Sequence, residues 1–290
     1  MARSLTDMIV TRRAWLRGAL AIAAELAFAG HSQAQSARTS FENWVTTFRP
    51  RALARGISAK TYDRVMDGLK PDTSVYALKN AQPEFQETTW QYLNRRVSDW
   101  RIATGKQIAK EHAGLLARVE REYGVDRYLM LALWGVESAY GEERVQRTFM
   151  RPVFPALAAL AYGEPRRRAY WEQELLNALT IVQRGWARPD VMVGSWAGAM
   201  GHTQWMPEVW LQIGVDFDGD GRISPFGPPD DALAGSARYL LERGRYRRGE
   251  SWGGEVRLPE TFAAHFAGGE PHFRLQGFKS TISRGGDCSR

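Results

Sequence analysis

The chain has 290 residues, of which 44% are hydrophobic and 11% aromatic, so it can bury the core of one large or two small domains. Its net charge of +7 and pI near 9.7 favour a polyanionic partner such as nucleic acid, an anionic membrane surface or an acidic cell wall. The basic residues are scattered and no nucleic-acid-binding signature accompanies them, so we expect no nucleic-acid partner. The single cysteine, Cys288, excludes an intrachain disulfide and a cysteine-based metal site.

The N-terminus has the layout of an export signal. Basic residues, among them Arg12 and Arg13, precede the apolar stretch 18–30, which runs out into small and polar residues. The segment Thr11–Arg17 resembles the twin-arginine motif, and an ordinary basic signal region is the alternative. We therefore predict a signal peptide at 1–34. No later segment reaches the roughly 20 apolar residues that span a bilayer, so we expect no stable membrane anchor.

The first elements after the signal are expected to be helices. Apolar residues recur at three- and four-residue spacing, as at Phe41, Trp44 and Phe48. Ser58 is placed to cap a short helix, and no alternating strand pattern of useful length occurs. We interpret residues 35–122 as an N-terminal helical part.

Further helices follow this part. Gly124 is expected to end one helix and Asp126 to cap the next, which runs to Glu137. That helix is apolar nearly all round, which predicts that it is buried. Two more helices are predicted at 166–184 and 231–243.

Glu137 ends the apolar helix in the sequence Gly-Val-Glu-Ser. Desolvation of a buried carboxyl would raise its pKa and keep it protonated near neutral pH, as a general acid requires. A glutamate that caps or pairs at a helix end is the structural alternative. A second cluster, residues 194–207, favours chemistry: its small residues allow close backbone approach, and Ser195 and Gln204 offer hydrogen bonds among aromatic side chains.

The two motifs together resemble the lytic murein transglycosylase B family. The resemblance rests on two motifs: an apolar helix that ends in Gly-Val-Glu-Ser and, later in the chain, the sequence Gly-Ser-Trp-Ala-Gly-Ala-Met-Gly that begins at Gly194. Further stretches that match the family in order are Gln82-Pro83-Glu84-Phe85, Leu160-Ala161-Tyr162, Pro165-Arg166-Arg167 and the Asp-rich loop after Ile213. The similarity covers residues 41–265.

This resemblance implies a mainly α fold. The family has a lysozyme-like α-helical domain with a small β-hairpin and an N-terminal helical subdomain. We therefore expect a catalytic core at 123–265 and an irregular tail at 266–290. The family chain normally continues further and completes its groove with a segment that has no counterpart in 268–290, so we expect a truncated tail.

The resemblance also implies a reaction on peptidoglycan glycan strands in the periplasm. Such enzymes cleave the β-1,4 bond between N-acetylmuramic acid and N-acetylglucosamine and leave a 1,6-anhydromuramic end, without a cofactor for the chemistry. Glu137 would be acid first and then base for the sugar's own C6 hydroxyl. The resemblance assigns substrate contacts to Ser195, Gln204, Tyr239, Arg166 and Arg167. Each arginine fits a solvated helix face equally well, and core packing explains Tyr140 and Met206 as well as groove lining does.

The sequence from Asp216 to Ile223 reproduces the first half of an EF-hand calcium loop. Gly227 replaces the usual twelfth-position glutamate, so the plain motif fails. The family resemblance implies a longer loop, 216–231, which ends in Asp231, with Asp230 as competitor. The predicted ligands of a structural Ca²⁺ are Asp216, Asp218, Asp220, the backbone of Arg222 and Asp231. An Asp/Gly turn without metal is the alternative.

Two other functions stay open. A water-using muramidase-type hydrolase needs a second carboxylate roughly 6.5–9.5 Å from Glu137, and Glu142, Glu143 or Glu208 could supply it. An inactive peptidoglycan-binding protein is the other possibility, because of the missing C-terminal segment. We expect a monomer.

Overall fold

The computed structural model describes residues 40–81, 87–142, 144 and 148–251. Contacts divide the chain into two units, Met1–Glu250 and Ser251–Arg290, and the fold below is that of the described part of the first unit. The predicted signal peptide and tail lie outside the described residues. None of the helices within the described ranges is long and apolar enough to cross a bilayer.

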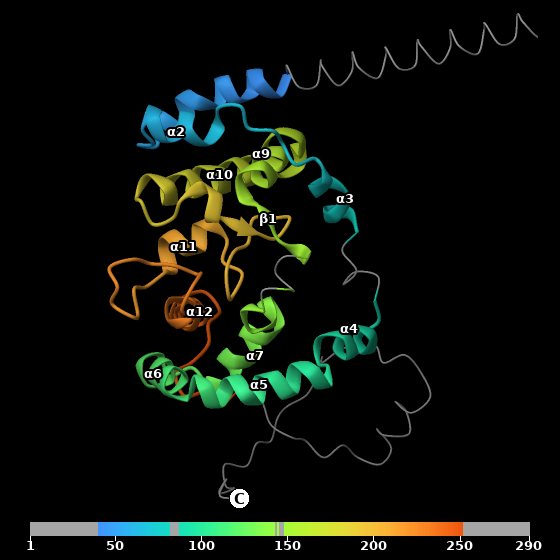
Figure 1. Cartoon of the computed structure of the whole chain (residues 1–290), viewed down its shortest axis with the longest axis vertical. Helices are drawn as coiled ribbons and strands as arrows, with labels where there is room; N and C mark the ends of the chain where they lie inside the picture. The colour runs from blue at the N-terminus through green and yellow to red at the C-terminus, as the bar shows by residue number, and fades with distance from the viewer. Residues whose placement is uncertain (1–39, 82–86, 143, 145–147, 252–290) are drawn as a thin grey trace, which may run out of the picture. The chain divides into compact units, whose positions relative to one another are not determined.

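One hydrophobic core brings the start of the chain against its middle. Its elements are the helical residues 40–54, α2 (Ala59–Met66), α3 (Ser74–Asn80), α9 (Val153–Gly163), α10 (Arg168–Gln183) and α11 (Pro207–Ile213). Figure 1 shows α9 and α10 side by side, and α10 also contacts α2 and α11. Phe41 and Phe48 are both buried here, as their helical spacing predicts.

A second core holds the helix that carries Glu137. It forms between α6 (Ala113–Tyr123), α7 (Arg127–Ser138) and α12 (Asp230–Glu242). Before them in the chain come α4 (Thr89–Arg96) and α5 (Asp99–Glu111), and α5 contacts both α6 and α7. Because α12 also contacts α11, the two cores are joined at that pair of helices.

A small sheet has its second strand at the start of the Gly-rich residues 194–207. Strand β1 (Arg151–Pro152) pairs antiparallel with β2 (Val193–Gly194), and α9 and α10 lie between the two strands in the sequence. The mainly α class with a small β element is therefore confirmed, although no tight turn joins these strands. Short 3₁₀ turns at Ala139–Gly141, Pro165–Arg167 and Pro189–Val191 complete the elements.

Several predicted helix ends are confirmed. The Ser58 side chain accepts from the Thr61 N–H, and Gly124 ends α6 with φ of 65°. The prediction that the helix before Glu137 is buried is correct for only one of its sides. Tyr128 of α7 is 61% exposed, because only one side of the helix faces the second core.

Candidate active site

The C-terminal end of α7 has an unusual backbone. The Asp126 side chain caps its N-terminus by accepting from the N–H groups of Tyr128 and Leu129. Beyond Ser138, the chain turns through two successive non-glycine residues in the left-handed region, Ala139 with φ of 52° and Tyr140 with φ of 62°. Such backbone costs about 1–3 kcal/mol per residue and is common at functional sites.

Packing explains why the chain holds this turn. The Tyr140 ring lies against two glycines, Gly105 of α5 and Gly135 of α7, where a Cβ would collide with it. Its hydroxyl donates to the Arg101 carbonyl at 3.1 Å. Tyr140 thus packs into the α5–α7 contact, directly after the last turn of α7, which carries Glu137.

Glu137 itself is exposed, contrary to the expectation of a buried carboxyl. Among the described residues it has no hydrogen-bond or ion-pair partner. The surrounding protein nevertheless removes part of its hydration, and this desolvation raises the pKa of the Glu137 carboxyl above its usual value. The positive charge of Arg96 acts in the opposite direction and lowers that pKa. The carboxyl is therefore reachable by a ligand and biased toward its protonated form.

Residues 194–207, the Gly-rich loop, fold back on themselves. Met200 bridges both Gly194 and Trp205, and the Ser195 hydroxyl accepts from the Ala199 N–H at 3.2 Å. Gln204 has a φ of 53° and donates from its side chain to the Gly201 carbonyl at 3.0 Å.

Hydrogen bonds connect this loop to the end of α7. The Ser138 hydroxyl, next to Glu137, donates to the His202 carbonyl at 2.6 Å. One turn earlier, the indole Nε1 of Trp134 donates to His202 Nδ1 at 3.1 Å. The structure therefore joins the two stretches that sequence reasoning singled out, the helix bearing Glu137 and the Gly-rich loop.

The other predicted substrate residues lie on different elements. Tyr239 is exposed on α12, with the Arg243 guanidinium 5.9 Å from its ring centre. Arg166 and Arg167 are both exposed in the 3₁₀ turn before α10. Arg167 lies over the ring of Tyr170 at 4.3 Å. No described contact joins these side chains to Glu137.

Residues 216–231, the acidic loop, bring three carboxylates together. Oxygens of Asp216, Asp218 and Asp231 lie within 4.8 Å of one another. Asp220 does not belong to this group. The competitor Asp230 faces Arg118 at 3.7 Å instead.

The candidate second carboxylates for a hydrolase differ in their surroundings. Glu208 forms a bidentate ion pair with Arg243, with both oxygen–nitrogen distances at 2.7 Å, so its negative charge is paired. Glu142 is exposed, and Glu143 lies outside the described residues.

Comparison with known proteins decides the family. Residues 40–285 match the family described as Transglycosylase SLT domain, which is more than half of the chain. The chain belongs to this family. The match also extends past residue 265, where the predicted similarity ends.

Individual proteins similar to this chain include lytic transglycosylases. The chain is 31% identical over 182 residues to the membrane-bound lytic murein transglycosylase B of Escherichia coli, covering 62% of this chain and 48% of the relative. It resembles Pseudomonas aeruginosa SltB3 in complex with NAG-anhNAM-pentapeptide, with 43% identity and a TM-score of 0.69, over 76% of this chain and 57% of the other. Escherichia coli Slt35 in complex with calcium gives 27% identity and a TM-score of 0.62, over 71% and 64%. The chain thus spans about half the length of the first two relatives.

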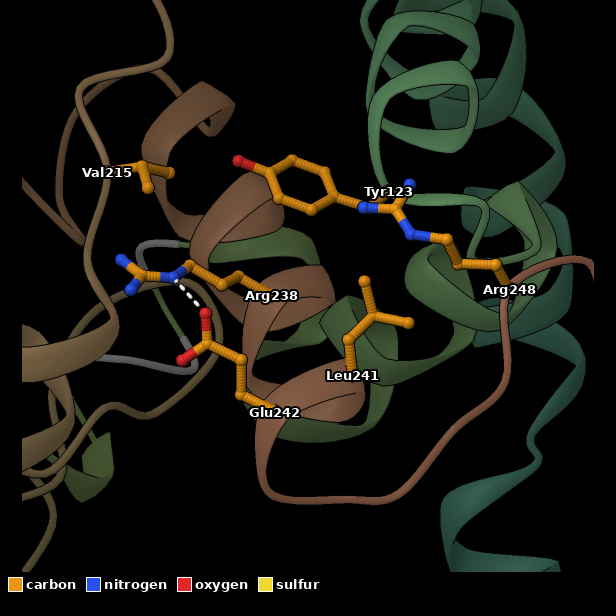
Figure 2. Close-up of a pocket in the computed structure, with 6 residues that line it drawn as sticks. All are labelled: Tyr123, Val215, Arg238, Leu241, Glu242 and Arg248. Atoms are coloured by element: carbon orange, nitrogen blue, oxygen red, sulfur yellow. Dashed lines mark hydrogen bonds and ion pairs between the residues drawn. The ribbon is translucent and has the colours of Figure 1, made fainter.

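Two residues of this transglycosylase domain, Tyr170 and His202, lie beside the predicted site residues but were not singled out from the sequence. Tyr170, beside Arg167, could have been found from its place one helical turn after the arginine pair. His202 could not, because its partners are distant in sequence. Figure 2 shows a separate pocket that none of the predicted site residues lines; its residues are Tyr123, Val215, Arg238, Leu241, Glu242 and Arg248.

Proposed function

We propose that this chain is a lytic transglycosylase that cleaves the β-1,4 bond between N-acetylmuramic acid and N-acetylglucosamine of peptidoglycan. The observation that carries the proposal is the state of Glu137, an accessible carboxyl with a raised pKa at the strained end of α7. The SltB3 structure with NAG-anhNAM-pentapeptide supports the substrate class, because its ligand contains an anhydro sugar.

In this reaction a single carboxyl acts twice. Protonated Glu137 gives its proton to the glycosidic oxygen as the bond from that oxygen to C1 of the muramoyl residue breaks. The resulting carboxylate then takes the proton of the C6 hydroxyl of the same sugar, whose oxygen bonds to C1 and closes the 1,6-anhydro ring. No water is consumed, and Glu137 returns to its starting state.

The substrate contacts and the location belong to the same proposal. Ser195 and Gln204 of the Gly-rich loop and Tyr239 of α12 would hold the glycan strand. Arg166 and Arg167 offer exposed cations for the carboxylates of the strand's lactyl or peptide groups. Export to the periplasm, supported by the basic and apolar N-terminal sequence, would bring the chain to this substrate.

The identity of the product tests this function. Purified peptidoglycan digested with the chain should release anhydromuropeptides, identified by mass spectrometry, and a sample without protein gives the background. Products with reducing ends would instead indicate the hydrolase, which adds water. A folded protein that retains glycan strands and releases nothing would indicate a binding protein.

Removing the charge of Arg96 should move the alkaline limit of activity, which desolvation of Glu137 mainly determines. A general acid stops working as the pH rises through its pKa, so kcat/KM is expected to fall on the alkaline side. Because the charge of Arg96 lowers the pKa of Glu137, Arg96→Met should raise that pKa and move this limb to higher pH. The pH profile of kcat/KM measures the shift. Arg95→Met is the control, since Arg95 pairs with Glu87 and does not contribute to the pKa of Glu137; equal shifts in both variants would contradict the prediction.

We also propose that the acidic loop holds a structural Ca²⁺. Asp231 is only 4% exposed, and its two carboxylate oxygens accept from the N–H groups of Phe217 and Ser224. Among the described residues it has no basic partner that would balance its charge. A buried carboxylate without a cation is costly, and a hard divalent ion is bound by clustered carboxylates such as those of Asp216, Asp218 and Asp231. The ion would tie the loop to α12, and it would take no part in the chemistry.

Calcium should therefore raise the thermal stability. At a concentration about 100-fold above its dissociation constant, the ion would add about 2.7 kcal/mol to the free energy of unfolding, or very roughly 8 °C in Tm. Differential scanning calorimetry with calcium and with chelator measures the increment. Asp231→Asn should abolish the increment, whereas Asp230→Asn, which changes the neighbouring carboxylate beside Arg118, should keep it. An increment that survives in Asp231→Asn would count against this site.

A further inference from the structure

His202 lies where three segments meet. Its Nδ1 faces Trp134 of α7 at 3.1 Å, and its Nε2 lies 2.7 Å from the Gly227 carbonyl of the acidic loop. Its backbone N–H donates to the Pro225 carbonyl at 3.0 Å, and its backbone carbonyl accepts from Ser138 at 2.6 Å. All the hydrogen-bonding groups of this residue of the Gly-rich loop are therefore used.

The partners determine which ring nitrogen carries the proton. An indole N–H can only donate, so Nδ1 of His202 must accept and carry no proton. A backbone carbonyl can only accept, so Nε2 must carry one. His202 is therefore the neutral Nε2–H tautomer. Burial favours the same form, because desolvation lowers the pKa of His202, an effect that the Gly227 hydrogen bond opposes and nearby His112 reinforces.

The contacts of His202 join the Gly-rich loop to the last turn of α7, which carries Glu137. Trp134 is buried one turn before Glu137, and its ring meets that of His202 edge-on at 5.3 Å. Ser138 follows Glu137 directly and binds the His202 backbone. The residues on both sides of Glu137 are thus held by one residue of the Gly-rich loop, which is itself anchored to the acidic loop.

We propose that His202 is a positioning residue, which fixes the end of α7 against the Gly-rich and acidic loops and so places Glu137 over the scissile bond. The proposal rests on the proposed transglycosylase function. His202 acts through Trp134 and the backbone, so it need not touch the substrate. Small displacements of a catalytic group are costly, since about 1 Å can lower a rate by about 100-fold.

Three substitutions separate the contacts of the ring. His202→Phe keeps a ring and removes both side-chain hydrogen bonds. His202→Asn places an amide oxygen near the position of Nδ1 and can still accept from Trp134. His202→Gln places an amide N–H near the position of Nε2 and can still donate to Gly227. His112→Phe is the matched control, because the His112 ring also meets Trp134 edge-on at 5.3 Å but makes no described hydrogen bond to it.

Release of anhydromuropeptides gives kcat and KM for each variant. We expect His202→Phe to lower kcat by between about 10- and 100-fold with a much smaller change in KM. His202→Asn should retain more of kcat than His202→Gln, because its remaining partner, Trp134, lies on the helix that carries Glu137. His112→Phe should retain the wild-type kcat. A His202→Phe variant that loses only thermal stability, with an unchanged kcat for the folded protein, would overturn the proposal.

A second readout does not depend on turnover. Carboxyl ¹³C NMR can titrate Glu137, assigned with Glu137→Gln. If His202 positions Glu137, His202→Phe should shift this titration and His202→Asn should restore it. An inactive wild-type chain would end the proposed function, while the titration would still decide the structural part of the proposal. Identical Glu137 titrations in wild type and His202→Phe would refute it.

Discussion

Glu137→Gln is expected to lower the release of anhydromuropeptides by about 1000-fold or more. General acid–base catalysis contributes roughly 10²–10⁴-fold, and here the same carboxyl would serve both steps. Glutamine has nearly the same shape but cannot give or take the proton. Since Glu137 is exposed and has no partner among the described residues, the fold should be unaffected, with Tm within about 2 °C of wild type. Mass-spectrometric digestion assays and calorimetry measure both quantities.

Glu142→Gln is the control for this variant. Glu142 is also exposed and lies five residues further along, beyond the strained turn. Under the single-carboxyl mechanism it should keep full activity and give the same products. If Glu142→Gln lost activity as severely as Glu137→Gln, a two-carboxylate hydrolase would become the better interpretation.

Local patterns predicted the fold well because they rest on neighbouring residues. The capping side chains of Ser58 and Asp126 and the terminal glycine of α6 satisfy backbone groups within their own turn, so their sequence signals are complete. The helix predicted at 231–243 is displaced by one residue, to Asp230–Glu242. The family is likewise confirmed, since its motifs are local.

The surroundings of the candidate site could not be predicted from local sequence, because they depend on contacts between residues that are distant in the chain. The exposure of Glu137 depends on which side of α7 faces the second core, and that depends on α6 and α12 together. Tyr140 adopts its strained backbone because glycines of two different helices leave room for its ring. The roles of Ser195, Gln204, Tyr239 and the arginine pair remain predictions, because they concern a bound glycan strand.

The second large effect is expected at Gly201, which lies directly before His202. Its φ of 73° is costly for any residue with a Cβ, by about 1 kcal/mol. A Cβ there would also lie 2.7 Å from the Pro225 carbonyl carbon and closer still to its oxygen, so the two loops would have to separate. Overpacking of this kind costs about 1–3 kcal/mol. We expect Gly201→Ala to lower the free energy of unfolding by about 3 kcal/mol and Tm by roughly 9 °C.

Gly185→Ala separates the two causes. Gly185 has the same φ of 73°, and a Cβ added there would meet no atom within 4 Å, so only the backbone cost remains, about 1 kcal/mol or roughly 3 °C. The difference between the two variants, measured by calorimetry, therefore reports the close approach of the Gly-rich and acidic loops. Equal losses in both variants would mean that the loops separate at little cost. A larger loss at Gly201, together with a lower kcat, would mean that this approach also keeps His202 against α7.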